Sequence, residues 1–311
     1  MRILHLDAGR EMRGGQWQVL RLIDGLAAAG VESTLLARAG APLFEAARKQ
    51  GCRVEGLGLA WTAMLARKHD LVHAHDARGH TFGAMVPGRP LVVSRRVAFA
   101  VGAVGPRRAH LGSRWKYGRA ARYIAVSEFV KSVLIEGGVP EEKISVVYDG
   151  VPVLEQGRQA GDLLHDMTCV LSPANAGDPR KGAPLALEAA RLADVNLQLS
   201  SDLDRDLRHA AVFVYVTHSE GLGSGVLLAM SAGVPVVASR VGGLPEVICH
   251  GENGLLVDNE PGAIAAAIRE LVENPGLARS IGSAARQTVI ERFTVNHMVR
   301  RTMEVYRQVL K

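Results

Sequence analysis

The sequence predicts an α/β fold with two doubly wound parallel sheets and a cleft between them. Two series of buried strands alternate with helices, one before and one after a polar stretch at residues 153–166. In both series a glycine-rich turn follows a buried strand, which is typical of Rossmann-like domains. The 311 residues suffice for two domains of ordinary size. We therefore expect one domain at residues 1–155, a second at 165–290 and a final helical segment at 291–311.

Composition restricts the class of protein. Of the residues, 48% are apolar, yet no uninterrupted apolar run reaches the roughly 18 residues of a membrane span. The first residues become polar too soon for a signal peptide. Cys52, Cys169 and Cys249 have no metal or disulfide spacing, which favours the reducing cytoplasm. The formal net charge of +6 indicates anionic partners.

The N-terminal domain begins with an apolar strand at residues 3–6. Gly14 and Gly15 follow, then an amphipathic helix that ends before Gly30 and a second strand at 31–37. Glycines after a strand let backbone N–H groups approach a phosphate, but they serve a plain strand-to-helix connection equally well. On the residues alone, both interpretations of Gly14 and Gly15 stay open.

Polar side chains end the strand that starts near residue 70. His73, His75 and Asp76 have a spacing that would suit a metal ion, but no further ligand is evident. We favour a place for His75 and Asp76 at the carboxyl end of the strand, where open α/β sheets bind their ligands.

A basic segment follows the next strand, at residues 91–94. No acidic residue occurs from residue 77 to 127, and Trp115 and Tyr117 are interleaved with the cations. These cations are Arg78, Arg89, Arg95, Arg96, Arg107, Arg108, Arg114, Lys116, Arg119 and Arg122. Such a run suits a solvated face, anionic lipid headgroups or nucleic acid, but no nucleic-acid motif accompanies it. We expect peripheral membrane contact through residues 95–122 and no nucleic-acid partner.

The remaining segments continue the alternation of strands and helices. In the first half we expect helices at 41–50 and 128–136 and strands at 123–127 and 144–148. In the second half we expect strands at 168–172 and 196–200 and helices at 183–193, 261–274, 277–293 and 295–311.

The most informative block lies between residues 212 and 257. An apolar strand at 212–217 leads into the turn Glu220-Gly-Leu-Gly-Ser-Gly and a helix at 226–232. A second strand at 235–238 ends near a second turn, Gly242-Gly243. Two glycine turns beside a carboxylate suit a ligand with both phosphate and hydroxyl groups, such as a sugar nucleotide.

This block resembles the donor-site signature of glycosyltransferase family 4, the retaining sugar-nucleotide transferases of the GT-B fold. The matching segments are Glu220-Gly-Leu-Gly, Gly233-Val-Pro-Val-Val-Ala-Ser, Val241-Gly-Gly-Leu-Pro-Glu and Gly254-Leu-Leu-Val. The resemblance implies a GT-B architecture whose last helix crosses back to the N-terminal domain. It also places Gly14 and Gly15 in a glycine loop that faces the donor phosphates.

The resemblance further implies roles for individual residues. Glu220 would contact the donor sugar, and Lys181 would neutralise the leaving diphosphate. We count His75, at its strand end, with these catalytic residues. The nucleotide would lie against Asn175, Lys181, Glu220, Gly221, Leu222, Gly223 and Ser224.

The sequence departs from the family pattern at three positions. The second Glu of the donor motif falls on Leu228, and the diphosphate-binding Arg falls on Ala176. A sugar-contacting His is replaced by Arg95 and Arg96, which suggests a substrate with extra negative charge.

The sequence thus predicts an enzyme that moves a sugar from a nucleoside diphosphate sugar to an acceptor hydroxyl with retention. We expect no cofactor and no metal, and an anionic glycan or lipid-linked acceptor, such as a lipopolysaccharide core. The expected location is cytoplasmic, on the inner face of the membrane. One alternative is a non-catalytic descendant that binds a sugar or nucleotide. Another is a GT-B enzyme of different chemistry, such as an epimerase or a phosphorylase.

Overall fold

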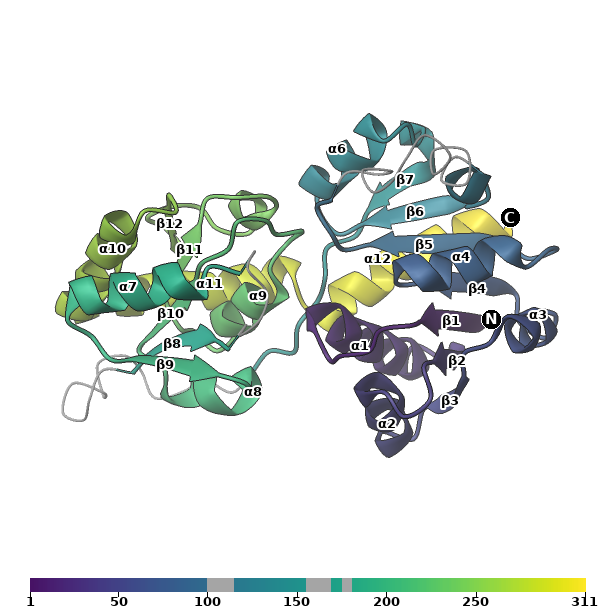
Figure 1. Ribbon diagram of the computed structural model, residues 1–311, viewed down its shortest axis with the longest axis horizontal. Helices are drawn as coiled ribbons and strands as arrows, with labels where there is room; N and C mark the ends of the chain where they lie inside the picture. The colour runs from purple at the N-terminus through teal and green to yellow at the C-terminus, as the bar shows by residue number, and fades with distance from the viewer. Residues whose placement is uncertain (100–114, 155–168, 175–180) are drawn as a thin grey trace. The chain divides into compact units, whose positions relative to one another are not determined.

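The computed structural model describes residues 1–99, 115–154, 169–174 and 181–311 (Figure 1). The chain divides into two compact units. The N-terminal unit comprises Met1–Asp149 and Val295–Lys311, and the C-terminal unit comprises Gly150–Thr294. Each unit is built on one parallel sheet.

The N-terminal unit contains a seven-stranded sheet in the order β3-β2-β1-β4-β5-β6-β7. Its strands are β1 (Arg2–Asp7), β2 (Glu32–Ala37), β3 (Arg53–Gly56), β4 (Leu71–Ala74), β5 (Leu91–Arg95), β6 (Arg122–Ala125) and β7 (Ile144–Val146). Apart from Arg2, every residue of the central strands β1 and β4 is buried, as expected of a sheet covered on both faces. Their register places His5 opposite His73. Because all pairs are parallel, the carboxyl ends of the strands form one edge.

Helices connect these strands and begin at recognisable signals. They are α1 (Gly14–Ala28), α2 (Pro42–Lys49), α3 (Leu59–Ala66), α4 (Ala77–Met85), α6 (Glu128–Glu136) and the 3₁₀ turn η1 (Glu141–Lys143). The Asp76 carboxylate accepts hydrogen bonds from the first-turn amides of α4, and the Ser127 hydroxyl accepts one from Val130 N at the start of α6. Each satisfies a backbone donor that the helix leaves open.

The last helix, α12 (Val295–Leu310), belongs to the N-terminal unit. Figure 1 shows it in yellow beside the N-terminal sheet. Met298 and Tyr306 are buried in the same core as Leu22 and Leu26. The absence of a side chain at Gly25 allows α1 and α12 to approach closely, because a Cβ there would lie 2.6 Å from Val299 Cγ2.

The C-terminal unit contains a five-stranded sheet in the order β12-β11-β10-β8-β9. The strands are β8 (Val170–Pro173), β9 (Leu197–Ser200), β10 (Val212–Tyr215), β11 (Val236–Ser239) and β12 (Leu255–Val257). The helices are α7 (Ala183–Ala193), α8 (Leu203–Asp206), α9 (Ser224–Ser231), α10 (Pro261–Glu273) and α11 (Pro275–Arg292), with 3₁₀ turns η2 (Leu207–His209) and η3 (Leu244–Glu246). Ile264 and Ile268 of α10 pack against Val212 and Val214 of β10 in the core.

The predicted α/β class with two parallel sheets is confirmed. The boundary between the units differs by a few residues from the predicted one, because Val151 N donates to Phe293 O and holds the chain after Gly150 to the C-terminal unit. The strand expected at 144–148 ends at Val146, and β3, α3 and α4 were not predicted. In the parts of the chain that the structure describes, no helix is both long and apolar enough to span a membrane.

Candidate functional site

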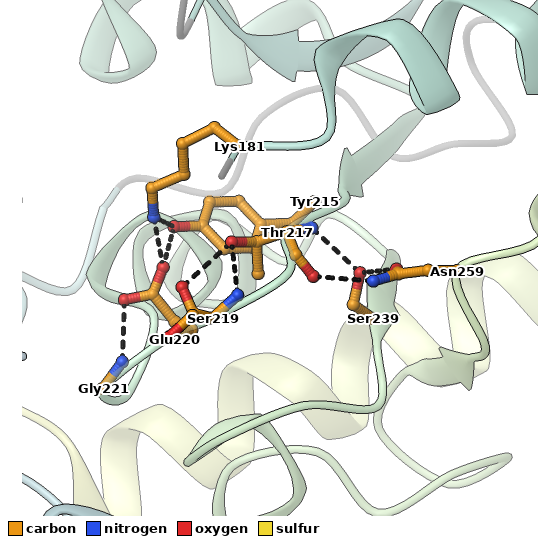
Figure 2. A network of polar contacts seen from close by, with 8 residues as sticks. All are labelled: Lys181, Tyr215, Thr217, Ser219, Glu220, Gly221, Ser239 and Asn259. Atoms are coloured by element: carbon orange, nitrogen blue, oxygen red, sulfur yellow. Dashed lines mark hydrogen bonds and ion pairs between the residues drawn. The ribbon is translucent and has the colours of Figure 1, made fainter. Parts of the chain in front are cut away.

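Three polar side chains meet at the carboxyl end of β10 (Figure 2). Lys181 Nζ donates to Glu220 Oε2 at 2.6 Å, and the Tyr215 hydroxyl donates to the same oxygen at 2.5 Å. Lys181 Nζ also lies 3.3 Å from the Tyr215 oxygen. The side chain of Glu220 is 15% exposed and that of Lys181 is 25% exposed. The structure therefore brings together the two residues, Lys181 and Glu220, that the sequence marked for sugar and diphosphate.

The backbone of Lys181 is fixed beside the strand end. Lys181 forms an isolated bridge with Thr217, and Gly182 N donates to Val216 O at 3.0 Å. A Cβ at Gly182 would lie 2.5 Å from Val216 Cγ1, which is too close for any larger residue. The glycine after Lys181 is thus required for this close approach, and the lysine enters the site from a defined position.

The turn that carries Glu220 packs against the second glycine turn. Gly243 N donates to Glu220 O at 3.3 Å, and Gly221 N donates to the Glu220 carboxylate at 3.1 Å. Gly242 has a φ of +57°, and a Cβ there would collide with Glu220 O. The two turns that the sequence singled out therefore support each other, and together they orient the carboxylate.

A second polar chain supports the same loop from the strand side. The Ser239 hydroxyl accepts a hydrogen bond from Thr217 N at 2.9 Å and donates to Asn259 Oδ1 at 2.6 Å. Asn259 Nδ2 donates to Thr217 O at 3.0 Å (Figure 2). These bonds tie the ends of β10 and β11 to the residues that follow β12.

Tyr215 and Asn259 were not predicted as site residues. Burial, together with the adjacent Glu220 carboxylate, raises the pKa of the Tyr215 hydroxyl well above its ordinary value. Tyr215 therefore stays protonated and acts as a donor. The sequence did contain a signal for Tyr215: its polar hydroxyl is on the last residue of an otherwise apolar strand. Strand ends carry ligand-facing groups in this fold class.

The predicted nucleotide-contacting residues after Glu220 lie in one turn. Leu222 is buried, Gly223 adopts a left-handed conformation with φ of +96°, and Ser224 begins α9. Leu228 lies within α9 and is buried. Asn175 and Ala176 lie outside the described residues.

The candidates in the N-terminal unit lie at its strand edge. Gly14 and Gly15 form the first turn of α1, and a Cβ at Gly15 would lie 3.8 Å from Arg96 Cδ. His75 is buried just beyond β4, with its Nε2 2.9 Å from His5 Nδ1 and its Nδ1 3.3 Å from Arg96 Nη1.

His75 and Asp76 follow the end of β4 directly, at the carboxyl edge of the sheet. The metal cluster of His73, His75 and Asp76, which the sequence analysis did not favour, differs from the grouping of side chains in the structure. The Asp76 carboxylate is engaged by Ala8 N and Gly79 N at the start of α4. His5 of β1 joins His73 and His75 instead, because parallel pairing places it opposite His73. Arg96 against His75 adds positive charge beside this trio, which disfavours a cation there.

The basic segment is described only in part. Arg95 donates to the Tyr117 hydroxyl at 2.9 Å and Arg119 to Ala84 O at 3.3 Å, so these two cations hold the unit together. Trp115 is exposed. Arg107, Arg108 and Arg114 lie outside the described residues.

Comparison with known families assigns both halves of the chain. Residues 12–154 match the family described as Glycosyltransferase Family 4, and residues 185–288 match the family described as Glycosyl transferases group 1. The chain is 33% identical over 199 residues to alpha-maltose-1-phosphate synthase of Mycolicibacterium smegmatis. That alignment covers 58% of this chain and 51% of the relative. The chain thus spans about half the length of this curated relative.

Solved structures share the fold over the whole chain. Anabaena Alr3699/HepE in complex with UDP-glucose superposes with a TM-score of 0.86 at 19% identity, covering 99% of this chain and 100% of that one. The apo form of the lipopolysaccharide outer core galactosyltransferase WaaB superposes with a TM-score of 0.70 at 14% identity, covering 99% and 100%. The fold is therefore that of a GT-B protein. Both family models that match parts of the chain describe glycosyltransferases.

Proposed function

We propose that the protein transfers a sugar from a nucleoside diphosphate sugar to an acceptor hydroxyl, with retention of anomeric configuration. The observation that carries this proposal is the cluster of Lys181, Tyr215 and Glu220 between two interlocked glycine turns. A cation, a carboxylate and turn amides are the groups that a sugar diphosphate needs. Tyr215, Glu220 and both turns lie within the region matched by the Glycosyl transferases group 1 family, and Lys181 lies four residues before it.

The ion pair between Lys181 and Glu220 suggests how the donor enters. A bound diphosphate competes with the Glu220 carboxylate for Lys181 and offers it more negative charge. Once Lys181 turns to the phosphate, Glu220 is free to accept hydrogen bonds from sugar hydroxyls, while Tyr215 still holds one carboxylate oxygen. The pair thus keeps both charges satisfied before the donor binds.

The chemistry relies on charge stabilisation and positioning. The bond from the anomeric carbon to the diphosphate breaks, and Lys181 stabilises the charge that develops on the leaving oxygen. The acceptor oxygen forms the new bond on the same face of the sugar, and its proton passes to the departing diphosphate oxygen. No protein nucleophile, cofactor or metal is part of this proposal, which relies on holding the reactants in place.

The proposed donor follows from a structural neighbour that binds a sugar nucleotide and from the glycine turns of this chain. The structural relative HepE binds UDP-glucose, so UDP-glucose is the first donor to test. Gly14 and Gly15 would approach the phosphates from the N-terminal unit. In the C-terminal unit, Asn175 and residues 221–224 would surround the nucleotide.

The acceptor is proposed to be an anionic or lipid-linked glycan. The net charge of +6 and the acid-free basic segment support an anionic acceptor. The structural neighbour WaaB is named as a lipopolysaccharide outer core galactosyltransferase. The proposed location is the cytoplasmic face of a membrane. Sedimentation with anionic vesicles at low salt should retain the protein, and raising salt should release it, because charges beyond about 8 Å are screened at physiological ionic strength.

The matched variants for this test are two double reversals in the N-terminal unit. Arg107→Glu with Arg108→Glu should abolish vesicle binding, whereas Arg300→Glu with Arg301→Glu on α12 should leave it unchanged. If both double variants bound the vesicles equally well, the basic segment would not be the membrane-binding surface.

Release of nucleoside diphosphate from a panel of sugar nucleotides, with and without acceptor glycans, tests the activity. Release that requires an acceptor supports transfer. Binding without turnover supports a second candidate, a non-catalytic protein that binds a sugar nucleotide. That candidate is favoured by Leu228, a buried apolar residue where the family motif has a carboxylate.

A further inference from the structure

Arg96 follows β5 at the carboxyl edge of the N-terminal sheet and has two side-chain acceptors. Its Nε donates to Asp149 Oδ1 at 3.1 Å, and its Nη1 lies 3.3 Å from His75 Nδ1. The Arg96 and Asp149 side chains are only 11% and 8% exposed. A buried guanidinium that is hydrogen-bonded to side chains on two sides has little freedom to rotate.

The contact with Arg96 fixes the protons on a chain of buried histidines. A guanidinium only donates, so His75 Nδ1 must accept and its proton must be on Nε2. That proton is donated to His5 Nδ1 at 2.9 Å, and His5 then donates from Nε2 to Ser33 Oγ at 3.2 Å. The hydrogen bonds therefore run in one direction, from Arg96 through His75 and His5 to Ser33.

Both imidazoles must be neutral for this chain to exist, and their surroundings agree. Burial lowers the pKa of His5 to about 3, and burial with the neighbouring imidazoles and Arg96 lowers the pKa of His75 well below its ordinary value. A neutral His75 with its proton on Nε2 is a fixed acceptor, and it is poorly suited to general acid–base catalysis near neutral pH.

The remaining donors of Arg96 are directed at no protein acceptor within the described residues. A guanidinium has five N–H groups, and two are used by Asp149 and His75, which leaves three (5 − 2 = 3). Gly15 beside Arg96 Cδ contributes no side chain that would cover it. The first turn of α1 contains no acidic residue that would compete for the cation.

We propose that Arg96 binds a carboxylate or phosphate group on a substrate of the proposed transfer reaction, and that His75 and His5 are positioning residues that hold its guanidinium. This inference rests on the proposed function and adds the chemical class of substrate. It also changes the role expected for His75, which supports Arg96 and does not act as a catalytic group. The anionic group belongs either to the donor sugar or to the acceptor.

Calorimetric binding with paired probes tests the proposal and separates the two sources. The donor arm compares UDP-glucuronate with UDP-glucose, and the acceptor arm compares glucose 6-phosphate with glucose. The wild-type protein should prefer the anionic member in one arm, and Arg96→Gln should reduce that preference roughly tenfold or more. The matched control Arg48→Gln, an exposed arginine on α2 of the same unit, should retain it.

The positioning role has its own variants and a spectroscopic readout. His75→Asn retains an acceptor near the Nδ1 position and should keep the preference within a few-fold, whereas His75→Leu should lose it as Arg96→Gln does. In ¹⁵N spectra of the wild-type protein, His75 should have a protonated Nε2 and a bare Nδ1 at neutral pH.

Two results would overturn this inference. In the first, the wild-type protein does not prefer the anionic ligand in either arm. In the second, the preference survives in Arg96→Gln. A His75 with its proton on Nδ1 would overturn the positioning role. Because the readout is binding, an anionic preference that depends on Arg96 in a protein without transfer activity would contradict only the proposed function.

Discussion

Tyr215 is the side chain that most directly holds the Glu220 carboxylate, through a hydrogen bond of 2.5 Å. Tyr215→Phe removes this donor and leaves Lys181 as the side-chain partner of the oxygen. We expect the rate of transfer to fall roughly 10- to 150-fold, since a hydrogen bond to a charged group contributes about 1.5–3 kcal/mol. Nucleotide affinity should change less than the rate, because the contact of the tyrosine hydroxyl with Lys181 is longer, at 3.3 Å.

The matched control is Tyr123→Phe in the N-terminal unit. Its hydroxyl also makes a short hydrogen bond, to Tyr117 O at 2.6 Å, so the same kind of contact is lost away from Glu220. Steady-state kinetics of both variants separate kcat from KM. Equal transfer rates for the two variants would contradict the proposal that Tyr215 orients the Glu220 carboxylate.

Single residues were predictable from sequence where a local motif fixed their surroundings. Glu220 and Lys181 were found because the glycine-containing segments around them resemble a family motif. At Lys181 the structure supplies the reason for the following glycine, since a Cβ at Gly182 would lie 2.5 Å from Val216 Cγ1. His5 was missed because its partners come from neighbouring strands and are set by sheet register. Tyr215 was missed because its contact with Glu220 depends on how the turn after β10 folds back. The capping role of Asp76 was missed because the helix that it caps had not been predicted.

The histidines of β1 and β4 make the N-terminal unit sensitive to acid. Burial lowers the pKa of His5 to about 3 and lowers those of His73 and His75 well below 6.5. A depressed pKa adds stability above the unfolded value of about 6.5 that is lost as pH falls toward the folded value. Each such group contributes a slope of up to about 1.4 kcal/mol per pH unit.

The Asp7 carboxyl changes the stability with pH in the opposite direction to the histidines. Burial raises the pKa of Asp7 to about 6, so its contribution to stability decreases as pH rises from about 4 to 6. Three histidines outweigh one aspartate. Urea unfolding should therefore show lower stability at pH 5 than at pH 7.5, and His5→Gln should reduce this difference. His209→Gln, at an exposed position, should leave it unchanged, and an unaltered pH dependence in His5→Gln would contradict this explanation.

The packing of α1 on α12 depends on Gly25. A Cβ at this position would lie 2.6 Å from Val299 Cγ2 and 3.0 Å from Val295 Cγ1. Gly25→Ala should lower the free energy of unfolding by about 1–3 kcal/mol, because the added methyl forces the helices apart. Gly262→Ala in α10 meets no atom within 4 Å and should raise it by about 0.5–1 kcal/mol.

Thermal or urea unfolding measures both glycine variants. Stabilisation by Gly25→Ala would show that α12 is not closely packed on α1.

Helices with a clear apolar face were predictable, and short apolar ones were not. The helices at Glu128–Glu136 and Ala183–Ala193 have the bounds that their sequence pattern gave. In contrast, α3 reads Leu-Ala-Trp-Thr-Ala-Met-Leu-Ala and has almost no polar residue to define a face. Periodicity therefore carries no signal there, and packing within the unit decides the conformation.

The two-unit architecture followed from the alternation of strands and helices, whereas the strand orders required the structure. The order β3-β2-β1-β4-β5-β6-β7 reverses direction after β3, and no local pattern specifies that reversal. It places β4 beside β1, and so it brings His75 next to His5. The class of protein was thus predictable, and the chemistry of its N-terminal unit was not.

Acceptor-dependent release of nucleoside diphosphate by the Glu220→Ala variant tests the proposed transfer reaction most directly. The wild-type protein is compared with this variant and with Glu270→Ala, which removes an exposed glutamate from α10 of the same unit. We predict that Glu220→Ala folds normally but loses roughly 10²–10³ in rate, as is typical when one preorganised polar contact is removed. Glu270→Ala should match the wild type. A near-wild-type rate in Glu220→Ala, or no acceptor-dependent release by the wild type with any sugar nucleotide, would contradict the assignment.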